Sequence, residues 1–142
     1  AHELKDVFRA VGGATRKPVI VKISPDFRET NEEITIPAAL DAGISIVNYG
    51  NTRRVDEPRL SQRSGGLSGP ALFATTLENV RRVRERFGDR LELIATGGID
   101  SPERARQALA AGATACGICT GFITRGPLLA RRILDALQPA GK

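Results

Sequence analysis

The chain has 142 residues, of which 41% are apolar and 26% are charged, and this balance predicts one globular domain with a single core. No stretch approaches the roughly 18 apolar residues of a bilayer-spanning helix, and no secretory signal pattern opens the chain, so we expect a soluble, cytoplasmic protein. The net charge is +5, but the arginines are spread over several segments and the single tyrosine offers little stacking surface, so nucleic acid is not expected as a partner.

Hydrophobic periodicity predicts an alternation of helices and short strands in the first third of the chain. A helix is expected at the start, where one face carries Leu4, Val7, Phe8 and Val11. Short apolar runs rich in β-branched residues predict buried strands at 19–24 and 44–49. The helical pattern from Thr30 to Ala42 is less regular, because Pro37 falls inside it and must kink or restart the helix.

A long connection follows the second strand. About 24 residues separate Gly50 from Thr75, and a connection of this length is typical of a lid or a binding loop. Thr75-x-x-Glu78 is a capping box, which predicts that a helix starts there. Gly88 is expected to lie just beyond the end of that helix.

Two further strand-helix units complete the chain. Apolar runs predict strands at 91–96 and 114–119. Ser101-Pro102 supplies an N-cap and a proline at the first helical position, and Gly112 is expected to end that helix. Pro127 is expected to open the last helix, which carries Leu128, Leu129, Ile133, Leu134 and Leu137.

The strict alternation of strands and helices predicts a parallel sheet with right-handed crossovers. Four βα units are half of a (β/α)8 barrel of the TIM type, a fold that binds ligands where its strands end. The alternative is a small doubly wound sheet, but no Gly-x-Gly-x-x-Gly follows the first strand. We therefore expect residues 1–142 to form a single α/β domain built as a half barrel.

Glycine clusters stand where predicted strands give way to helices. They are Gly65-Gly-Leu-Ser-Gly69, Thr96-Gly97-Gly98 and Cys119-Thr120-Gly121. Backbone N–H groups and a helix N-terminus both favour an anion at such places. The clusters therefore predict a phosphorylated cofactor or substrate.

Residues for other common chemistries are scarce. The only histidine is His2, so neither a histidine metal site nor a Ser-His triad is expected. Cys116-x-x-Cys119 could be a redox pair on a helix, but on the predicted strand residues three apart face opposite sides. We expect two isolated thiols and no metal. The chain has no methionine, so either an initiator was removed ahead of Ala1 or the sequence is an excerpt from a longer polypeptide.

Five motifs follow one another in order along the chain. They are Lys22-Ile-Ser-Pro-Asp26, Asn51-Thr52, Gly65-Gly-Leu-Ser-Gly69, Gly97-Gly98-Ile99 and Thr120-Gly-Phe-Ile-Thr-Arg-Gly-Pro127. Together they resemble the C-terminal half of dihydroorotate dehydrogenase, most closely its quinone-reducing, membrane-associated class. The resemblance implies a (β/α)8 barrel that binds flavin mononucleotide (FMN) and oxidises dihydroorotate to orotate in pyrimidine biosynthesis. The membrane-associated helices of that class precede the barrel, so membrane attachment does not carry over.

The resemblance also assigns roles to single residues. Lys22 would lie against the flavin ring and stabilise its negative charge, whereas the alternative is a lysine that reaches solvent at the strand end. Cofactor contacts are implied for Gly50, Gly69, Gly98, Cys119 and Thr120, the last three nearest the phosphate. Asn51 and Thr52 would hydrogen-bond the pyrimidine substrate. The structural alternatives are tight turns at the glycines and a turn-forming Asn-Thr pair.

The chain also departs from the family pattern. The family usually has Thr at Gly50, Tyr or a similar residue at Cys119, and another Thr at Arg53. In the family the catalytic base, several pyrimidine contacts and part of the flavin site come from the N-terminal half of the barrel. We therefore expect no catalytic residue in this chain, because a general base must lie within hydrogen-bond reach of its proton.

Several functions remain open on these residues. The leading hypothesis is a segment of an FMN-dependent oxidoreductase, and the nearest enzymatic alternative is a dihydropyrimidine dehydrogenase-like flavin barrel. A non-catalytic flavin or phosphate-binding half-barrel module is a second class, and a structural half barrel that pairs with a partner is a third. Because a half barrel leaves two unpaired edges and an exposed apolar face, we expect a homo-oligomer or a separate N-terminal half.

Overall fold

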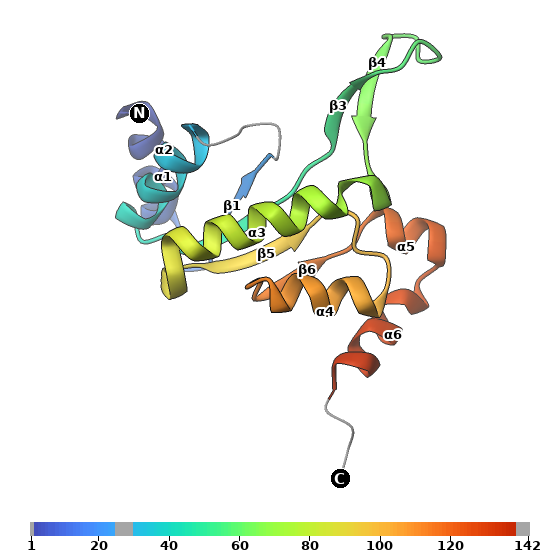
Figure 1. Cartoon of the computed structure of the whole chain (residues 1–142). Coiled ribbons are helices and arrows are strands. Elements are labelled where there is room, and N and C mark those ends of the chain that lie inside the picture. Colours follow the sequence, from blue (N-terminus) through green and yellow to red (C-terminus); the bar gives the residue numbers. More distant parts are fainter. Residues whose placement is uncertain (1, 25–29, 139–142) are drawn as a thin grey trace.

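The chain folds around a parallel sheet in the computed structural model, which describes residues 2–24 and 30–138 (Figure 1). Four strands lie in the order β1-β2-β5-β6. Their bounds are β1 Ile20–Ile23, β2 Ile46–Tyr49, β5 Glu92–Thr96 and β6 Ala115–Gly117. All neighbouring strands pair in parallel, as predicted, and each strand lies inside its predicted run.

Helices follow the strands in the predicted alternation. The first helix, α1 (His2–Ala14), precedes β1. The others are α2 (Thr30–Asp41), α3 (Phe73–Phe87), α4 (Pro102–Ala110), α5 (Thr120–Arg125) and α6 (Leu128–Leu137). α3 packs on β2 and β5, α4 packs on α3 and β6, and α6 packs on α4. The described chain is therefore built from four βα units of the (β/α)8 type, which confirms the predicted fold class.

The core lies between the sheet and its helices. Residues that alternate along the strands are buried on the helix side, namely Val21, Ile23, Val47, Tyr49, Leu93 and Ala95. α3 contributes Val80 and Val83, which are fully buried against them. Packing of this apolar face supplies the main driving force for the fold, because burial of each such side chain contributes roughly 1.5–3 kcal/mol.

The other face of the sheet is more open. Ile20 and Lys22 of β1 are exposed, and Ile46, Asn48 and Ile94 on the neighbouring strands are only half-buried. Parallel sheets are normally covered on both faces. The described residues therefore leave uncovered the face that would point into a closed barrel.

The long connection after β2 contains regular structure that the sequence did not predict. β3 (Arg53–Asp56) and β4 (Ser64–Leu67) pair antiparallel as a hairpin that projects from the body of the molecule (Figure 1). The sequence indicated a long connection here but gave no sign of the two strands within it. Its strands are rich in arginine and glycine, so they show no apolar alternation to indicate a strand.

The predicted start of α3 was also wrong. The helix begins at Phe73, with Leu72 as its N-cap and without a side-chain cap hydrogen bond, so Thr75-x-x-Glu78 is not a capping box. The reason is the 3-10 turn Gly69–Leu72, in which Pro70 sets a helical backbone that leads directly into α3. The predicted end is confirmed, because Gly88 follows the helix with a φ of 58°.

The proline inside α2 does not divide the helix. α2 runs from Thr30 to Asp41 without a restart at Pro37, because its face at Ile36, Ala38 and Ala39 is buried and this packing offsets the lost backbone hydrogen bond.

At the start of α4, Ser101 caps the helix as predicted, and its hydroxyl accepts a hydrogen bond from the Arg104 backbone. Pro127 is the N-cap of α6, also as predicted, whereas the short helix α5 before it was not predicted.

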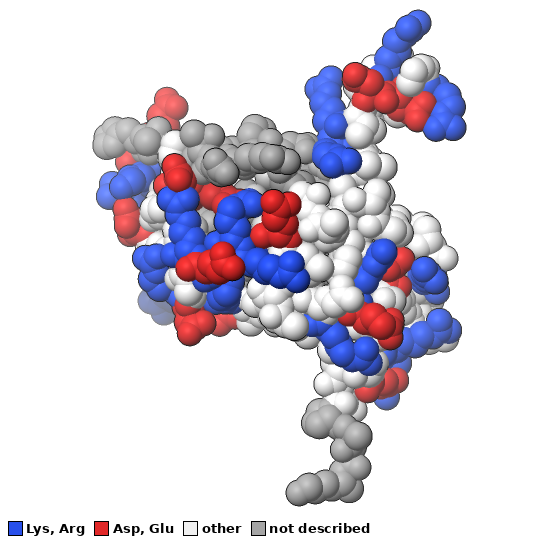
Figure 2. Space-filling view, viewed as in Figure 1, with Lys and Arg blue, Asp and Glu red and all other residues white. Residues whose placement is uncertain are grey.

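The visible surface carries mixed charge. In Figure 2 the basic and acidic side chains alternate over the helix layer and at the tip of the hairpin, as on an ordinary solvated face. None of the helices in the described part of the chain has the length and apolar composition needed to cross a bilayer. The longest of these helices, α3, has 15 residues.

Candidate functional site

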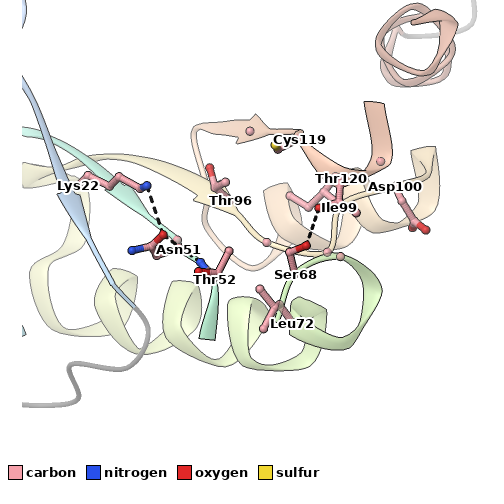
Figure 3. A pocket seen from close by; sticks show the side chains of 16 residues that line it. Lys22, Asn51, Thr52, Ser68, Leu72, Thr96, Ile99, Asp100, Cys119 and Thr120 are labelled. Atoms are coloured by element: carbon pink, nitrogen blue, oxygen red, sulfur yellow. Dashed lines mark hydrogen bonds between the residues drawn. The ribbon is translucent and has the colours of Figure 1, made fainter. Parts of the chain in front are cut away.

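One pocket collects the C-terminal ends of all four parallel strands (Figure 3). It contains every residue predicted as a site: Lys22, Gly50, Asn51, Thr52, Gly69, Gly98, Cys119 and Thr120. Its volume is about 160 Å³, below the roughly 300 Å³ at which small-molecule pockets begin. The chain therefore brings the predicted residues together in a cavity that fits one part of a larger ligand.

Lys22 lies on the open face of the sheet, where β1 ends. Its ammonium group points toward Asn51, and Nζ lies 3.5 Å from Asn51 Oδ1 (Figure 3). The side chain is exposed rather than buried in the core, because the inner face of the sheet is open. Pro25 and Asp26, the last two residues of its motif, lie outside the described residues.

Asn51 and Thr52 follow directly after β2. The Asn51 Oδ1 atom accepts a hydrogen bond of 3.0 Å from the backbone N–H of the next residue, Thr52. Both side chains are exposed and line the pocket. The amide oxygen of Asn51 is therefore shared between the Thr52 backbone and Lys22, and both Asn51 and Thr52 line the space where a ligand would lie.

Gly50 is required by crowding at the strand ends. A Cβ atom at this position would lie 1.8 Å from the backbone oxygen of Thr96 on the neighbouring strand. No side chain fits there without movement of β5. This contact gives a physical reason why the chain carries glycine where the resembled family usually carries threonine.

Gly98 is confined on two sides. Its φ is 69°, and a Cβ atom there would lie 2.7 Å from the Phe73 backbone nitrogen and 2.9 Å from the Gly69 oxygen. Only glycine combines this backbone conformation with such close contact. The turn after β5 is therefore packed directly against the start of α3.

Thr120 and Cys119 lie at the start of α5. The Thr120 hydroxyl group is within hydrogen-bond distance of the Ser68 hydroxyl, at 3.1 Å (Figure 3). Cys119 is exposed, forms no side-chain cap and lies beyond the end of β6, whereas a strand through 119 was predicted. Burial raises the pKa of Cys116, which lies in β6. Both cysteines are free.

The pocket also contains residues that were not predicted as site residues: Ser68, Leu72, Thr96, Gly97, Ile99, Asp100, Gly117 and Gly121. Several of them belong to the motifs described in the sequence analysis, but no ligand contact was assigned to them there. Thr96 is informative, because its Oγ1 atom is buried and has no hydrogen-bond partner among the described residues. A buried hydroxyl group normally has a partner, so this atom is suited to a ligand.

A buried ionic network lies at the end of β2. Tyr49, the last residue of β2, donates a hydrogen bond to the Glu32 carboxylate of α2. Arg82 of α3 binds the same carboxylate with two nitrogens, at 2.5 and 3.1 Å. Burial, followed by the Glu32 contact, raises the pKa of Tyr49 above its ordinary value of 10.0. The network fixes the end of β2, from which Asn51 and Thr52 extend.

The sequence model of the dihydroorotate dehydrogenase family matches residues 2–140. The chain belongs to this family. Relatives named dihydroorotate dehydrogenase (quinone) include proteins of Rhodococcus opacus (strain B4) and Chloroflexus aurantiacus (strain J-10-fl), each 39% identical to the chain. The matches cover 96% and 89% of this chain but only 40% and 36% of the relatives.

Solved structures of the family share the fold. Two crystal structures of DHODH from Eimeria tenella, one ligand-free and one in complex with ferulenol, align with TM-scores of 0.74 and 0.73 at 32% identity. Each alignment covers 86% of this chain, and 35% and 33% of the solved chains respectively. The chain therefore matches between about a third and two fifths of the length of these dihydroorotate dehydrogenases.

Proposed function

We propose that this chain provides the flavin-phosphate region and part of the substrate site of an FMN-dependent dihydroorotate dehydrogenase, which oxidises dihydroorotate to orotate in pyrimidine biosynthesis. The observation that carries the proposal is the convergence of the eight predicted residues on one pocket at the strand ends. Family membership supports the same reaction class. Within this proposal residues 1–142 form one domain, the C-terminal half of the barrel.

The pocket fits one end of FMN. Its walls carry several glycines without side chains, which permits the backbone to approach a phosphate, and the hydroxyl groups of Ser68 and Thr120 lie beside them. The unpartnered Thr96 hydroxyl supplies a further hydrogen-bonding group. Gly98, Cys119 and Thr120 are proposed to hold the phosphate, with Gly69 beside them.

Lys22 and Gly50 are proposed to lie at the ring end of the cofactor. The Lys22 ammonium group is exposed toward the pocket, where its positive charge would favour a negatively charged ring. When bound, FMN supplies the acceptor for the hydride that leaves the substrate. Asn51 and Thr52 are proposed to orient the pyrimidine, since an amide and a hydroxyl group match its alternating N–H and C=O groups.

The reaction needs groups that this chain is not proposed to provide. No catalytic base is assigned here, and the pocket volume of about 160 Å³ is small for a whole cofactor and substrate. A separate N-terminal half would have to supply the base, whereas a second copy of the chain could only close the barrel. We further propose that the assembled protein is cytoplasmic and takes a small pyrimidine as its substrate.

A second candidate is a flavin or phosphate-binding half barrel without catalysis. The small pocket and the open inner face of the sheet favour it, because they limit how firmly this chain alone can enclose a reacting pair. A third candidate, a structural half barrel, needs no ligand.

An absorption spectrum of the purified full chain after incubation with FMN and desalting separates these candidates. Retained flavin bands support either binding function, and a colourless protein supports the structural one. Anaerobic addition of dihydroorotate to the flavin-loaded chain, mixed with the N-terminal half of a relative that supplies the base, then separates the first two, because bleaching of the flavin band requires electron transfer to the cofactor. Retained flavin without bleaching in that mixture would overturn the catalytic proposal and leave the binding module as the function of this chain.

A further inference from the structure

A carboxylate lies in the wall of the pocket near the proposed phosphate position. Asp100 follows the Gly97-Gly98 turn, lines the pocket and is only 8% exposed. In Figure 3 its carboxylate points away from Lys22 and Thr96. A buried negative charge beside an anion site would repel the anion, so Asp100 must contribute something other than ligand contact.

Both oxygens of this carboxylate are bound by arginines from different helices. Arg104 of α4 donates from Nη1 to Oδ1 at 3.0 Å, and Arg125 of α5 donates from Nη2 to Oδ2 at 3.2 Å. Two positive partners offset the charge of Asp100, which explains how it is tolerated at the pocket wall. The carboxylate therefore joins α4 to α5.

Arg104 connects Asp100 to the Gly97-Gly98 turn. The Nη1 atom that binds Asp100 also donates to the backbone oxygen of Gly98 at 3.0 Å. The Arg104 guanidinium group lies 4.9 Å from the centroid of the Phe73 ring at the start of α3. Because Gly98 is already packed against Phe73, these contacts hold the turn in one position.

Arg125 connects Asp100 to the helix that carries Thr120. Arg125 and Thr120 both belong to α5, which spans only Thr120–Arg125. At Gly121, a Cβ atom would lie 2.9 Å from the Ile99 oxygen and 3.1 Å from the Asp100 Cα atom, so α5 packs directly on the chain beside Asp100. The ion pair at the far end of this short helix therefore restricts its rotation and places the Thr120 hydroxyl group.

We propose that Asp100 is a positioning residue, which fixes the Gly97-Gly98 turn relative to Thr120 through Arg104 and Arg125. This inference rests on the proposed function, since these are the groups proposed to hold the FMN phosphate. Asp100 itself does not touch the ligand in this proposal. Its effect is exerted on the phosphate end of FMN and not on the ring.

A positioning role and simple electrostatics predict opposite changes in FMN affinity for the same substitution. Asp100→Asn keeps the shape of the side chain but removes a negative charge near the phosphate and replaces one accepting oxygen by an NH2 group, which cannot accept from a guanidinium group. By charge alone, the variant should bind an anion more tightly. If Asp100 positions the site, the variant should bind FMN more weakly despite its additional positive charge.

Titration of the full chain with FMN and with riboflavin, which lacks the phosphate, tests this inference. We expect Asp100→Asn to weaken FMN binding about tenfold and to leave riboflavin binding unchanged, because the lost interactions are hydrogen bonds to a charged group. Asp135→Asn is the matched control. It removes the same charge from an exposed ion pair with Arg131 on α6, outside the pocket, and should change neither affinity.

The outcomes separate this inference from the proposed function. Equal or tighter FMN binding by Asp100→Asn would overturn the positioning role, and so would an equal loss of affinity for both ligands. A wild-type chain with no preference for FMN over riboflavin would overturn the phosphate site itself and the inference with it. If Asp100→Asn does not fold, Arg125→Gln removes one partner of the carboxylate at a side chain that is 59% exposed. An unchanged preference for FMN in that variant would also overturn the inference.

Discussion

Single residues at the strand ends carry the proposed chemistry, and Lys22 is the one whose role can be separated from folding. Its side chain is exposed on an open sheet face, and its hydrogen bond to Asn51 is long, at 3.5 Å. Loss of the ammonium group should therefore affect a negatively charged ligand more than the stability of the chain.

We expect Lys22→Ala to weaken flavin binding about tenfold and to change the free energy of unfolding by less than about 0.5 kcal/mol. Flavin fluorescence titration and urea denaturation measure the two effects. Lys17→Ala, at another exposed lysine, is the control and should change neither. Unfolding of Lys22→Ala would show that the residue is structural.

Gly50 tests the crowding between β2 and β5. Because a Cβ atom would lie 1.8 Å from the Thr96 oxygen, Gly50→Ala should destabilise the chain by about 1–3 kcal/mol. The matched control is Gly13→Ala in α1, where a Cβ atom would meet nothing within 4 Å and alanine should be neutral or stabilising. Equal denaturation midpoints for the two variants would contradict this account of Gly50.

At the scale of elements, the network of Glu32, Tyr49 and Arg82 joins α2, β2 and α3. Glu32 is only 1% exposed, and its charge is offset by the bidentate contact from Arg82. A pair of the same type, Glu33 with Arg86, joins α2 to α3 at the surface, where both side chains are about half exposed. The two pairs join the same helices, but the Glu32 pair is buried and bidentate whereas the Glu33 pair is solvated and has one hydrogen bond.

Arg82→Ala should lower the free energy of unfolding by about 3 kcal/mol, because it leaves a buried carboxylate without its positive partner. Arg86→Ala should cost less than about 1 kcal/mol, because its pair is solvated. Chemical denaturation of both variants gives the two values. Similar losses of unfolding free energy would mean that Arg82 stabilises the buried Glu32 carboxylate no more than Arg86 stabilises Glu33 at the surface.

Tyr49 gives the same network a pH dependence. Its pKa is raised in the folded state by burial and by Glu32, so its contribution to stability is fully present below about pH 10 and is lost as the pH rises above that value. We expect the free energy of unfolding to fall with pH more steeply in the wild type than in Tyr49→Phe, by up to about 1.4 kcal/mol per pH unit.

The chain has one tyrosine and no tryptophan, so the ultraviolet absorbance of tyrosinate reports on Tyr49 alone. Ionisation near the ordinary pKa of 10.0 in the folded chain would contradict this prediction.

At the scale of the whole molecule, the sheet has an open inner face and two edge strands, β1 and β6, within the described residues. Ile20, on β1, is 53% exposed there. We expect the chain to associate with a second copy or with a separate N-terminal half, because either would cover this face. Ile20→Lys should reduce self-association without unfolding the chain, as measured by sedimentation and circular dichroism. A wild-type chain that stays monomeric at high concentration would contradict self-pairing.

The sequence by itself determined the four strands, their parallel alternation with helices and the family, because apolar runs, caps such as Ser101 and ordered motifs are local signals. It also supplied all eight predicted pocket residues, since motifs at strand ends meet at one edge of a parallel sheet. Tertiary structure alone decided the projecting hairpin, the start of α3 and the ionic contacts of Asp100. These depend on partners distant in sequence, such as Arg125 for Asp100, and on backbone crowding, such as Gly50 against Thr96. No local sequence pattern indicates which residues such contacts will join.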